Sequence, residues 1–286
     1  MKTCLPLVAA SLLAAAGATS AQALATQPRP APVPIRADKI ILVGDSTTQV
    51  LSGWGGAFCA RHVSAFVACV NLGRGGRSSY SYRAEGSWDI ALAEMKTGAY
   101  DNTWVLVQFG HNDQPGKPGR STDLDREFPA NMRRYVEEIR AAGARPVLVT
   151  PLTRRMFTDG RLDDDLQPWA DAVRRIAREM DVPLVDLHAR SMAAVQGMGP
   201  VQAMTLAEIP PPSWMSAAAQ TGTTVDHDVP PPPEVPADPT GRAPLGQPKW
   251  QFDYTHLGDT GAAFFAAIVA DELTRVVPDL RERMYP

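Results

Sequence analysis

The sequence is poor in the residues and motifs that mark several large classes of protein. Of its 286 residues three are cysteine and five are histidine. No two histidines stand in the H-x-x-x-H or H-E-x-x-H spacing of a catalytic zinc site. The formal net charge of −3 is spread evenly, without the basic stripe of a nucleic-acid binder. After Ala18 no apolar run is long enough to span a bilayer. We therefore expect no metal, no other cofactor, no nucleic-acid partner and no membrane span.

Nucleotide-binding and α/β-hydrolase motifs are missing as well. Gly73, Gly75 and Gly76 follow an expected strand, but they lack the G-x-G-x-x-G spacing and the Lys-[Ser/Thr] of a P-loop, so phosphate binding is poorly supported. The G-x-S-x-G elbow is absent, since Ser46 sits in Gly-Asp-Ser-Thr. This argues against an α/β-hydrolase fold but leaves serine chemistry open.

The N-terminus has the pattern of an exported protein. Residues 1–25 combine an early lysine, a short apolar run of small residues and two overlapping A-x-A cleavage sequences, which predicts a signal peptide and a secreted or periplasmic protein. A Pro-rich lead-in follows at 26–37. Cys59 and Cys69 would then meet an oxidising compartment, where they form either a disulfide or two buried free thiols. The sequence leaves both possibilities open.

From residue 38 on, apolar runs alternate with amphipathic runs. The expected strands are 39–43, 65–72, 103–109, 145–150 and 183–187. The expected helices are 53–62, 88–96, 128–142, 167–180 and 259–276. Strands that are apolar throughout and alternate with helices indicate an α/β fold whose parallel sheet is covered on both faces. Ligands of such sheets bind beyond the carboxyl ends of the strands.

One segment breaks this alternation within what we expect to be a single domain, 38–286. Twelve of the 26 prolines fall in 197–250. Because proline at this density disfavours helices and central strands, we expect an insertion without regular structure. It is either a flap on the substrate side of the site or a mobile insertion.

Four short segments carry polar residues suited to catalysis, and three of them follow expected strands. They are 44–47, 71–78, 108–113 and 253–256. A serine that directly follows a strand is either a nucleophile or an ordinary helix N-cap.

The other polar residues of these segments also have two interpretations. Asp253 and His256 are three apart, which places them on one side of a helical turn. They form either a carboxylate that orients a general base or a cap with a nearby surface histidine. Asn112 is either an amide donor to a developing oxyanion or part of an Asx-turn, and its neighbour His111 is expected to be structural.

In combination these segments resemble the SGNH (GDSL-like) hydrolase superfamily, and in detail its rhamnogalacturonan acetylesterase-like branch. The resemblance spans 39–275, and its blocks occur in the family's order. The residues that carry it are Gly44-Asp-Ser-Thr47, Gly53-Trp-Gly55, Gly75-Gly-Arg-Ser78, Tyr82, Glu85-Gly86, Phe109-Gly-His-Asn-Asp113 and Asp253-Tyr-Thr-His256. It implies a flavodoxin-like three-layer α/β/α fold with about five strands and metal-free ester hydrolysis.

The resemblance also implies a role for each site residue. Ser46 would be the nucleophile, His256 the base and Asp253 the residue that orients it. The backbone N–H groups of Ser46 and Gly76 and the side chain of Asn112 would form the oxyanion hole. Gly75 competes with Gly76 for this role but matches the family less well, and Asp45 is interpreted as a local brace.

The implied activity is removal of acetyl groups from an acetylated oligo- or polysaccharide, pectic rhamnogalacturonan or a relative of it. Trp54, Trp88 and Trp250 are either platforms for sugar rings or ordinary core and surface residues. Two other functions stay open. One is a secreted lipid esterase or thioesterase, and the other is a catalytically silent carbohydrate-binding protein.

Overall fold

The structure, a computed structural model, describes residues 31–225 and 251–285. The chain divides into two units, Met1–Pro34 and Ile35–Pro286, and the second holds all the described helices and strands. The predicted signal peptide lies outside the described residues, as does part of the lead-in. Within the described ranges, no helix has the length and apolar character needed to cross a membrane.

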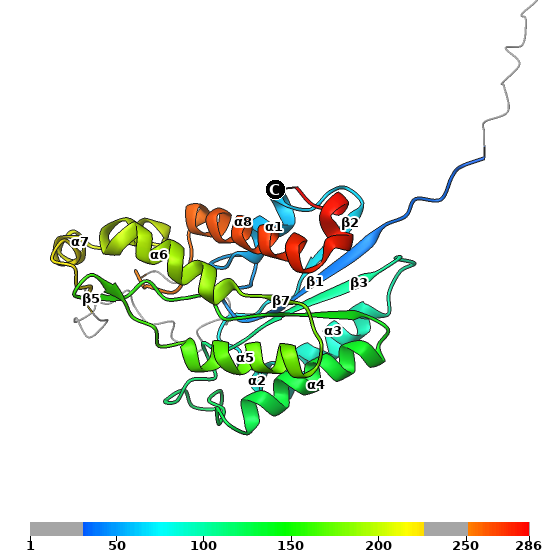
Figure 1. Ribbon diagram of the computed structural model, residues 1–286, viewed down its shortest axis with the longest axis horizontal. Helices are drawn as coiled ribbons and strands as arrows, with labels where there is room; N and C mark the ends of the chain where they lie inside the picture. The colour runs from blue at the N-terminus through cyan, green and yellow to red at the C-terminus, as the bar shows by residue number, and fades with distance from the viewer. Residues whose placement is uncertain (1–30, 226–250, 286) are drawn as a thin grey trace, which may run out of the picture. The chain divides into compact units, whose positions relative to one another are not determined.

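Five parallel strands form the central sheet in the order β2-β1-β3-β4-β7 (Figure 1). Their bounds are β1 Asp38–Gly44, β2 Val67–Asn71, β3 Thr103–Gln108, β4 Arg145–Val149 and β7 Leu184–Val185. This order is that of flavodoxin-like folds, and it confirms the fold predicted from the sequence. Strands β1 and β3 end level, since Gly44 pairs with Gln108. Chain segments that leave these two strands therefore start side by side at the point where the strand order reverses.

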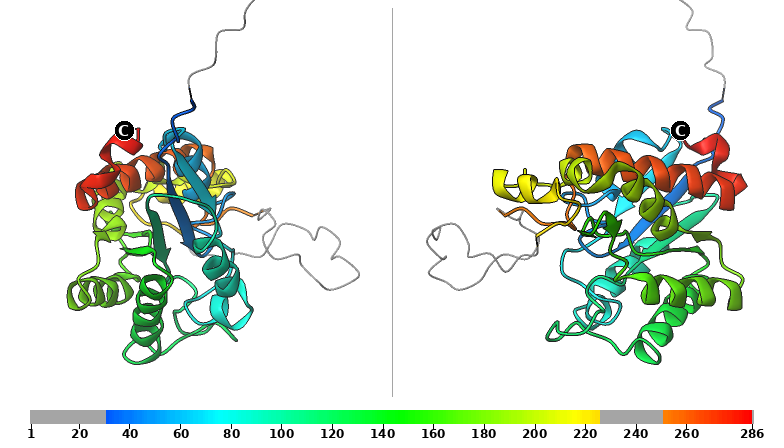
Figure 2. Two further views of the ribbon diagram at one scale, coloured as in Figure 1. Left: turned by 90° about the vertical axis from the view of Figure 1, so that its right-hand side faces the viewer. Right: turned by 60° about the vertical axis from the view of Figure 1, so that its left-hand side comes forward.

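Helices cover both faces of the sheet (Figures 1 and 2). Their bounds are α1 Gly55–Arg61, α3 Ser87–Met95, α4 Glu127–Ala141, α5 Gln167–Glu179, α6 Leu187–Ala203 and α8 Asp259–Val276. The fully buried β1 strand feeds two cores, because successive side chains point to opposite faces. Ile40 and Leu42 pack with residues of α1, α6 and α8, whereas Ile41 and Val43 pack with residues of α3, α4 and α5.

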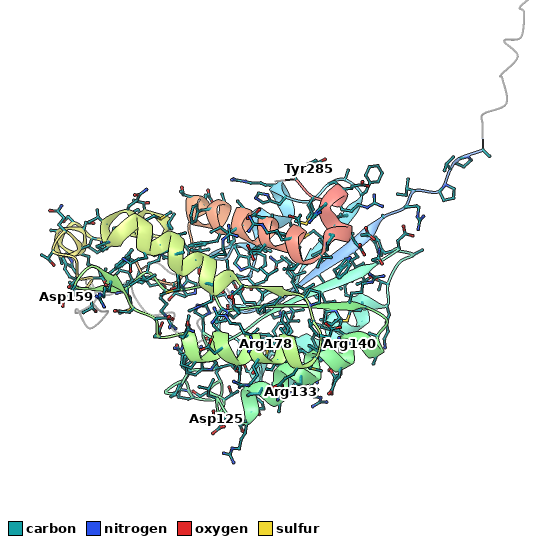
Figure 3. All side chains as sticks on the ribbon, viewed as in Figure 1. Asp125, Arg133, Arg140, Asp159, Arg178 and Tyr285 are labelled. Carbon is teal, nitrogen blue, oxygen red and sulfur yellow. A yellow bond between two sulfur atoms is a disulfide. The ribbon has the colours of Figure 1, made fainter. Side chains whose placement is uncertain are left out.

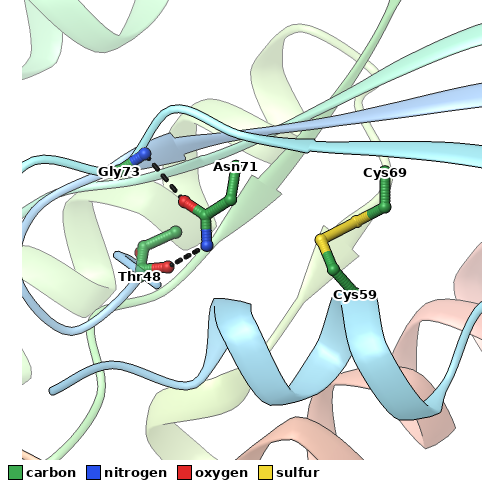
Figure 4. Close-up of a disulfide and its surroundings, with 5 residues drawn as sticks. All are labelled: Thr48, Cys59, Cys69, Asn71 and Gly73. Carbon is green, nitrogen blue, oxygen red and sulfur yellow. Dashed lines mark hydrogen bonds between the residues drawn. A yellow bond between two sulfur atoms is a disulfide. The ribbon is translucent and has the colours of Figure 1, made fainter. Parts of the chain in front are cut away.

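A disulfide ties α1 to the edge strand β2 (Figure 4). It joins Cys59 to Cys69, whose Cα atoms are 5.5 Å apart, within the usual range for such a bond. The alternative of two free thiols is therefore wrong.

Several short elements have no counterpart in the sequence prediction. They are α2 Ser81–Ala84, the hairpin of β5 Phe157–Thr158 and β6 Arg161–Leu162, and the 3-10 helices η1 Met204–Leu206 and η2 Pro278–Arg283. The longer helix α6 was also missed, because its alanines, glycines and methionines give little apolar periodicity. Asp186 is the N-cap of this helix, and its side chain accepts the backbone N–H of Ala189. The strand expected over 183–187 is therefore shorter, because the helix begins within it.

The expectation that 197–250 lacks regular structure is wrong for its first half. Helix α6 runs on to Ala203, and α7 spans Ser213–Ala219. Pro200 is tolerated because Gly199 breaks the helix at a φ of 74°, so the proline starts a new helical segment. Pro212 likewise lies at the N-cap of α7, outside the helical hydrogen bonds. The remainder of the segment, 226–250, lies outside the described residues.

Candidate active site

The turn after β1 presents Ser46 at the edge of the sheet. A side chain on Gly44 would meet Thr48 Oγ1 at 2.5 Å, so only glycine fits where the chain leaves the strand. Asp45 Oδ1 accepts the backbone N–H and the hydroxyl of Thr47, both over 2.8 Å. The backbone N–H groups of Thr48 and Gln49 both donate to the backbone oxygen of Asp45. Asp45 is thus the local brace that the sequence predicted.

A buried contact between a carboxylate and an imidazole lies beneath this turn. Asp45 Oδ2 is 3.3 Å from Nδ1 of His111, and both side chains are almost fully inaccessible. Burial raises the pKa of Asp45, but the interaction with His111 and the hydrogen bonds from Thr47 outweigh it, so the pKa lies below its ordinary value. His111 therefore has the structural place that we expected for it.

One arginine connects the two loops that carry the other predicted oxyanion donors. Gly76 has a φ of 78°, which glycine adopts without strain, whereas Gly75 stays outside this region. Arg120 Nη1 donates to the backbone oxygen of Gly76 over 3.4 Å and to Oδ1 of Asn112 over 3.2 Å. Asn112 Nδ2 in turn donates to the backbone oxygen of Arg77 over 3.1 Å. Since an amide nitrogen carries two hydrogens, Asn112 keeps one for another acceptor.

Asp253 and His256 form the predicted pair. Nδ1 of His256 lies 2.6 Å from Oδ2 of Asp253. Oδ1 of Asp253 accepts the backbone N–H groups of Thr255 and His256, over 2.8 and 2.7 Å. The carboxylate therefore fixes both the backbone and the ring of the histidine. With the proton on Nδ1, Nε2 is left as an acceptor. The local structure is a side-chain-stabilised turn before α8, not the helical turn that the spacing suggested.

A fully buried arginine holds this turn in place. Arg155 donates from Nη2 to the backbone oxygens of His256 and Asp253, over 2.8 and 3.3 Å, and from Nη1 to that of Thr255 over 3.2 Å. Its own N–H donates to the Tyr254 oxygen over 3.0 Å. Burial lowers the pKa of Arg155 to about 10, against the opposing charge of Asp253, so the guanidinium stays charged at neutral pH.

Backbone hydrogen bonds bring the serine and histidine segments together. Leu257, which follows His256, donates its N–H to the Ser52 oxygen over 2.9 Å. Two residues further on, Trp54 donates its N–H to the oxygen of Thr47 over 2.8 Å. The loop after Ser46 is thus bonded to the chain that follows His256, although Ser52 and Leu257 are 205 positions apart in sequence.

Several residues that build the site were missed by sequence reasoning. Arg120 lies in a Gly- and Pro-rich loop, and Arg155 follows β4 without a recognisable motif. The only signal for Arg155 was its place six positions after the end of β4, and Arg120 had no such signal. Trp54 and Trp88 lie in the hydrophobic core, with 0% and 2% of their surface exposed, so they are not platforms for sugar rings. Trp250 lies outside the described residues.

Comparison with known proteins gives a consistent result. The profile of the GDSL-like Lipase/Acylhydrolase family matches residues 42–204. A rhamnogalacturonan acetylesterase of Bacillus subtilis (strain 168) is 34% identical over 176 residues, which cover 59% of this chain and 72% of that protein.

Solved structures share the fold. The crystal structure of the B. subtilis protein YxiM superposes with a TM-score of 0.59 at 21% identity, over 85% of this chain and 57% of that one. A catalytic mutant of an acetylxylan esterase from Geobacillus stearothermophilus superposes with a TM-score of 0.51 at 17% identity, over 84% of this chain and 94% of that one.

Proposed function

Because the chain belongs to the GDSL-like lipase/acylhydrolase family, we propose that it is an acetylesterase acting on a carbohydrate, pectic rhamnogalacturonan or a related polysaccharide. Esterase chemistry of the SGNH type follows from the family. The acetyl group and the sugar rest on the likeness to the B. subtilis rhamnogalacturonan acetylesterase. The observation that supports catalysis best is the Asp253–His256 contact of 2.6 Å in a segment bonded to the loop after Ser46.

In the proposed reaction, Nε2 of His256 takes the hydroxyl proton of Ser46 as Oγ attacks the ester carbonyl. Asp253 stabilises the imidazolium that forms. The bond from the carbonyl carbon to the sugar oxygen then breaks, and His256 returns the proton to that oxygen. Water repeats the sequence on the acetyl-serine, which releases acetate and restores the serine.

The negative charge on the carbonyl oxygen needs fixed donors during this reaction. We assign this role to the backbone N–H groups of Ser46 and Gly76 and to the remaining N–H of Asn112. The contacts of Arg120 with Gly76 and Asn112 support the assignment, since they hold two of the three donors relative to each other.

Acetate release from acetylated rhamnogalacturonan, xylan and bacterial polysaccharide tests the proposal, together with 4-nitrophenyl esters of increasing acyl length. We expect fastest release from rhamnogalacturonan, a preference for acetyl over longer acyl groups, and no activity for Ser46→Ala. Ser213→Ala is the matched control, because Ser213 is an exposed serine at the start of α7. Preference for long acyl chains would favour a lipid esterase or thioesterase, and absence of hydrolysis would favour a binding protein.

We also propose that the protein is exported after removal of residues 1–25. The Cys59–Cys69 disulfide supports an oxidising compartment. Mass determination of the protein recovered from its native host tests this, because retention of residues 1–25 in the cytoplasm would contradict export.

A further inference from the structure

A cavity of about 320 Å³ lies among α2, α3 and α4, on the face of the sheet that these helices cover (Figure 1). Its volume is in the range of small-ligand pockets. Polar and aromatic side chains from three segments of the chain line it, namely Tyr80, Arg83, Asp89, Asn131 and Arg134. None of these residues belongs to the proposed triad or oxyanion hole, so the cavity is separate from the groups that react.

Arg83 brings a donor without an acceptor to this cavity. Its Nη2 donates to both carboxylate oxygens of Glu138, over 2.8 and 2.9 Å. The guanidinium lies over the rings of Trp88 and Tyr135, 5.6 and 5.0 Å from their centroids. Its Nη1 is buried and has no hydrogen-bond partner among the described residues. A buried N–H group without an acceptor is costly, and a ligand oxygen in the cavity would satisfy it.

The charges around the cavity are balanced. Arg134 also pairs with Glu138, from Nε over 2.7 Å, so this carboxylate serves both arginines. Asp89, exposed in the first turn of α3, adds a second carboxylate. Two guanidinium groups and two carboxylates cancel in charge, which gives an anionic ligand no advantage. Donors beside acceptors suit hydroxyl groups, which both donate and accept.

Tyr80 adds an aromatic surface to the cavity. It immediately precedes α2, and 52% of its surface is exposed. The face of an exposed tyrosine ring suits the C–H face of a sugar ring, because tyrosine buries large contact area while its hydroxyl stays in water. An aromatic surface beside donors and acceptors therefore favours a sugar over a wholly apolar ligand.

Hydrogen bonds connect the cavity to the loops of the proposed oxyanion hole. Ser79, which precedes Tyr80, donates its N–H to both carboxylate oxygens of Asp113 over 3.1 Å and its hydroxyl to Oδ1 over 2.6 Å. Asn131 Nδ2 donates to the Ser79 hydroxyl over 3.2 Å. Tyr80 stands four residues after Gly76, and four residues of fully extended chain span at most about 14 Å. One polysaccharide chain can therefore occupy the cavity and the proposed active site together.

We propose that this cavity is a binding site for a neutral sugar unit of a polysaccharide, in which Tyr80 stacks on the ring and Arg83 donates to a hydroxyl oxygen. The choice of a polysaccharide as ligand rests on the proposed function. The site holds a unit of the chain at a distance from the unit whose ester reacts, so it favours polymeric substrates over short ones.

Calorimetry with unacetylated tetrasaccharides on the full chain tests the site without requiring turnover. The probes are the linear tetrasaccharides of galactose, xylose and glucose, which carry no charge. We expect at least one of them to bind the wild type, and Tyr80→Ala to weaken its binding about tenfold. Tyr80→Phe keeps the ring and should bind as the wild type does. Arg83→Lys keeps the charge opposite Glu138 but loses the planar fork of donors, so it should also weaken binding.

Tyr285→Ala is the matched control, because Tyr285 is 55% exposed and lies on the side of the sheet that α8 covers (Figure 3). Its affinity for the probes should equal that of the wild type. Absence of binding by all three probes, or equal affinity of the wild type and either Tyr80→Ala or Arg83→Lys, would overturn the site.

Failure of the site is distinguishable from failure of the proposed function. Tetrasaccharide binding that depends on Tyr80, without acetate release from any polysaccharide, would contradict only the acetylesterase. Acetate release with the same KM for the wild type and Tyr80→Ala, and with no tetrasaccharide binding, would contradict only the sugar site.

Discussion

The buried guanidinium of Arg155 donates to the backbone oxygen of His256 over 2.8 Å, from a position 101 residues earlier in the chain. The same group also donates to the backbone oxygens of Asp253 and Thr255. One arginine after β4 thus determines where the turn with the proposed base lies relative to the sheet. Its role is to position the histidine, since its donors face the backbone.

Arg155→Met should therefore reduce turnover more than substrate binding. Without its donors three carbonyl groups lose a partner, so we expect the free energy of unfolding to fall by roughly 3 kcal/mol. In the folded protein kcat should fall about 100-fold with KM within about twofold, because a small displacement of the base is costly. Steady-state kinetics below the unfolding temperature measure this, and Arg155→Lys should restore part of kcat.

Arg154→Met is the control for this variant, since Arg154 pairs with Asp165 and Gln114 and does not contact the histidine turn. Its kcat should stay near that of the wild type. If Arg155→Met changed stability but left kcat intact, the positioning role would be wrong.

Asn112→Ala should lower kcat by about 10²–10³ with little change in KM, because the amide is proposed to donate to charge that exists only in the transition state. Asn102→Ala provides the comparison, since Asn102 is also held by its side chain, with one hydrogen bond to Asp38 over 2.8 Å, and precedes β3 at the far end of the strand. Similar losses in the two variants would mean that Asn112 acts on the fold and not on the oxyanion.

The buried carboxyl of Asp113 should make stability depend on pH. Burial raises its pKa to about 6, against the hydrogen bonds from Ser79 and Thr122 that favour the charged form. A carboxyl whose pKa is higher in the folded than in the unfolded state stabilises the fold. This stabilisation is complete below pH 3.8, the pKa of the unfolded chain, and it is lost as the pH rises through about 6. The stability of the wild type relative to Asp113→Asn should therefore decrease from pH 4 to pH 7. Urea unfolding of both proteins at these pH values measures the change. If the wild type gained stability relative to Asp113→Asn as the pH rose, the assignment would be wrong.

The disulfide should contribute to stability through the unfolded state. Replacing Cys59 and Cys69 by serine opens a short loop, and we expect a loss of about 2–3 kcal/mol in the free energy of unfolding. Urea unfolding of the double variant measures the loss. Reductant should lower the stability of the wild type to the same level and leave the variant unchanged, whereas equal stability of both proteins without reductant would contradict the prediction.

The sequence was sufficient for the sheet because its strands are local apolar patterns. Strand β3 is an apolar run that ends at Gln108, directly before the Phe109–Asp113 block, and α8 has the expected bounds, Asp259–Val276. Ser46 and the pair of Asp253 and His256 stand in short blocks of recognisable order. Their roles as nucleophile, orienting carboxylate and base remain predictions.

What the sequence did not reveal depends on long-range contacts. Arg155 reaches acceptors about 100 positions later, Arg120 bridges to a loop 44 positions earlier, and Asn71 contacts Thr48 from the next strand. No local pattern marks such residues, because their partners are set by the order of the strands. The helical segments within 197–225 were missed for another reason, since prolines at helix starts resemble prolines of an unstructured segment.

Labelling with a fluorophosphonate tests the central claim most directly, because this reagent forms a covalent bond only with an activated serine. The account predicts one adduct, found by peptide mass spectrometry on Ser46, and its loss in Ser46→Ala and in His256→Ala. An adduct on another residue, or labelling of Ser46→Ala at the wild-type rate, would contradict it.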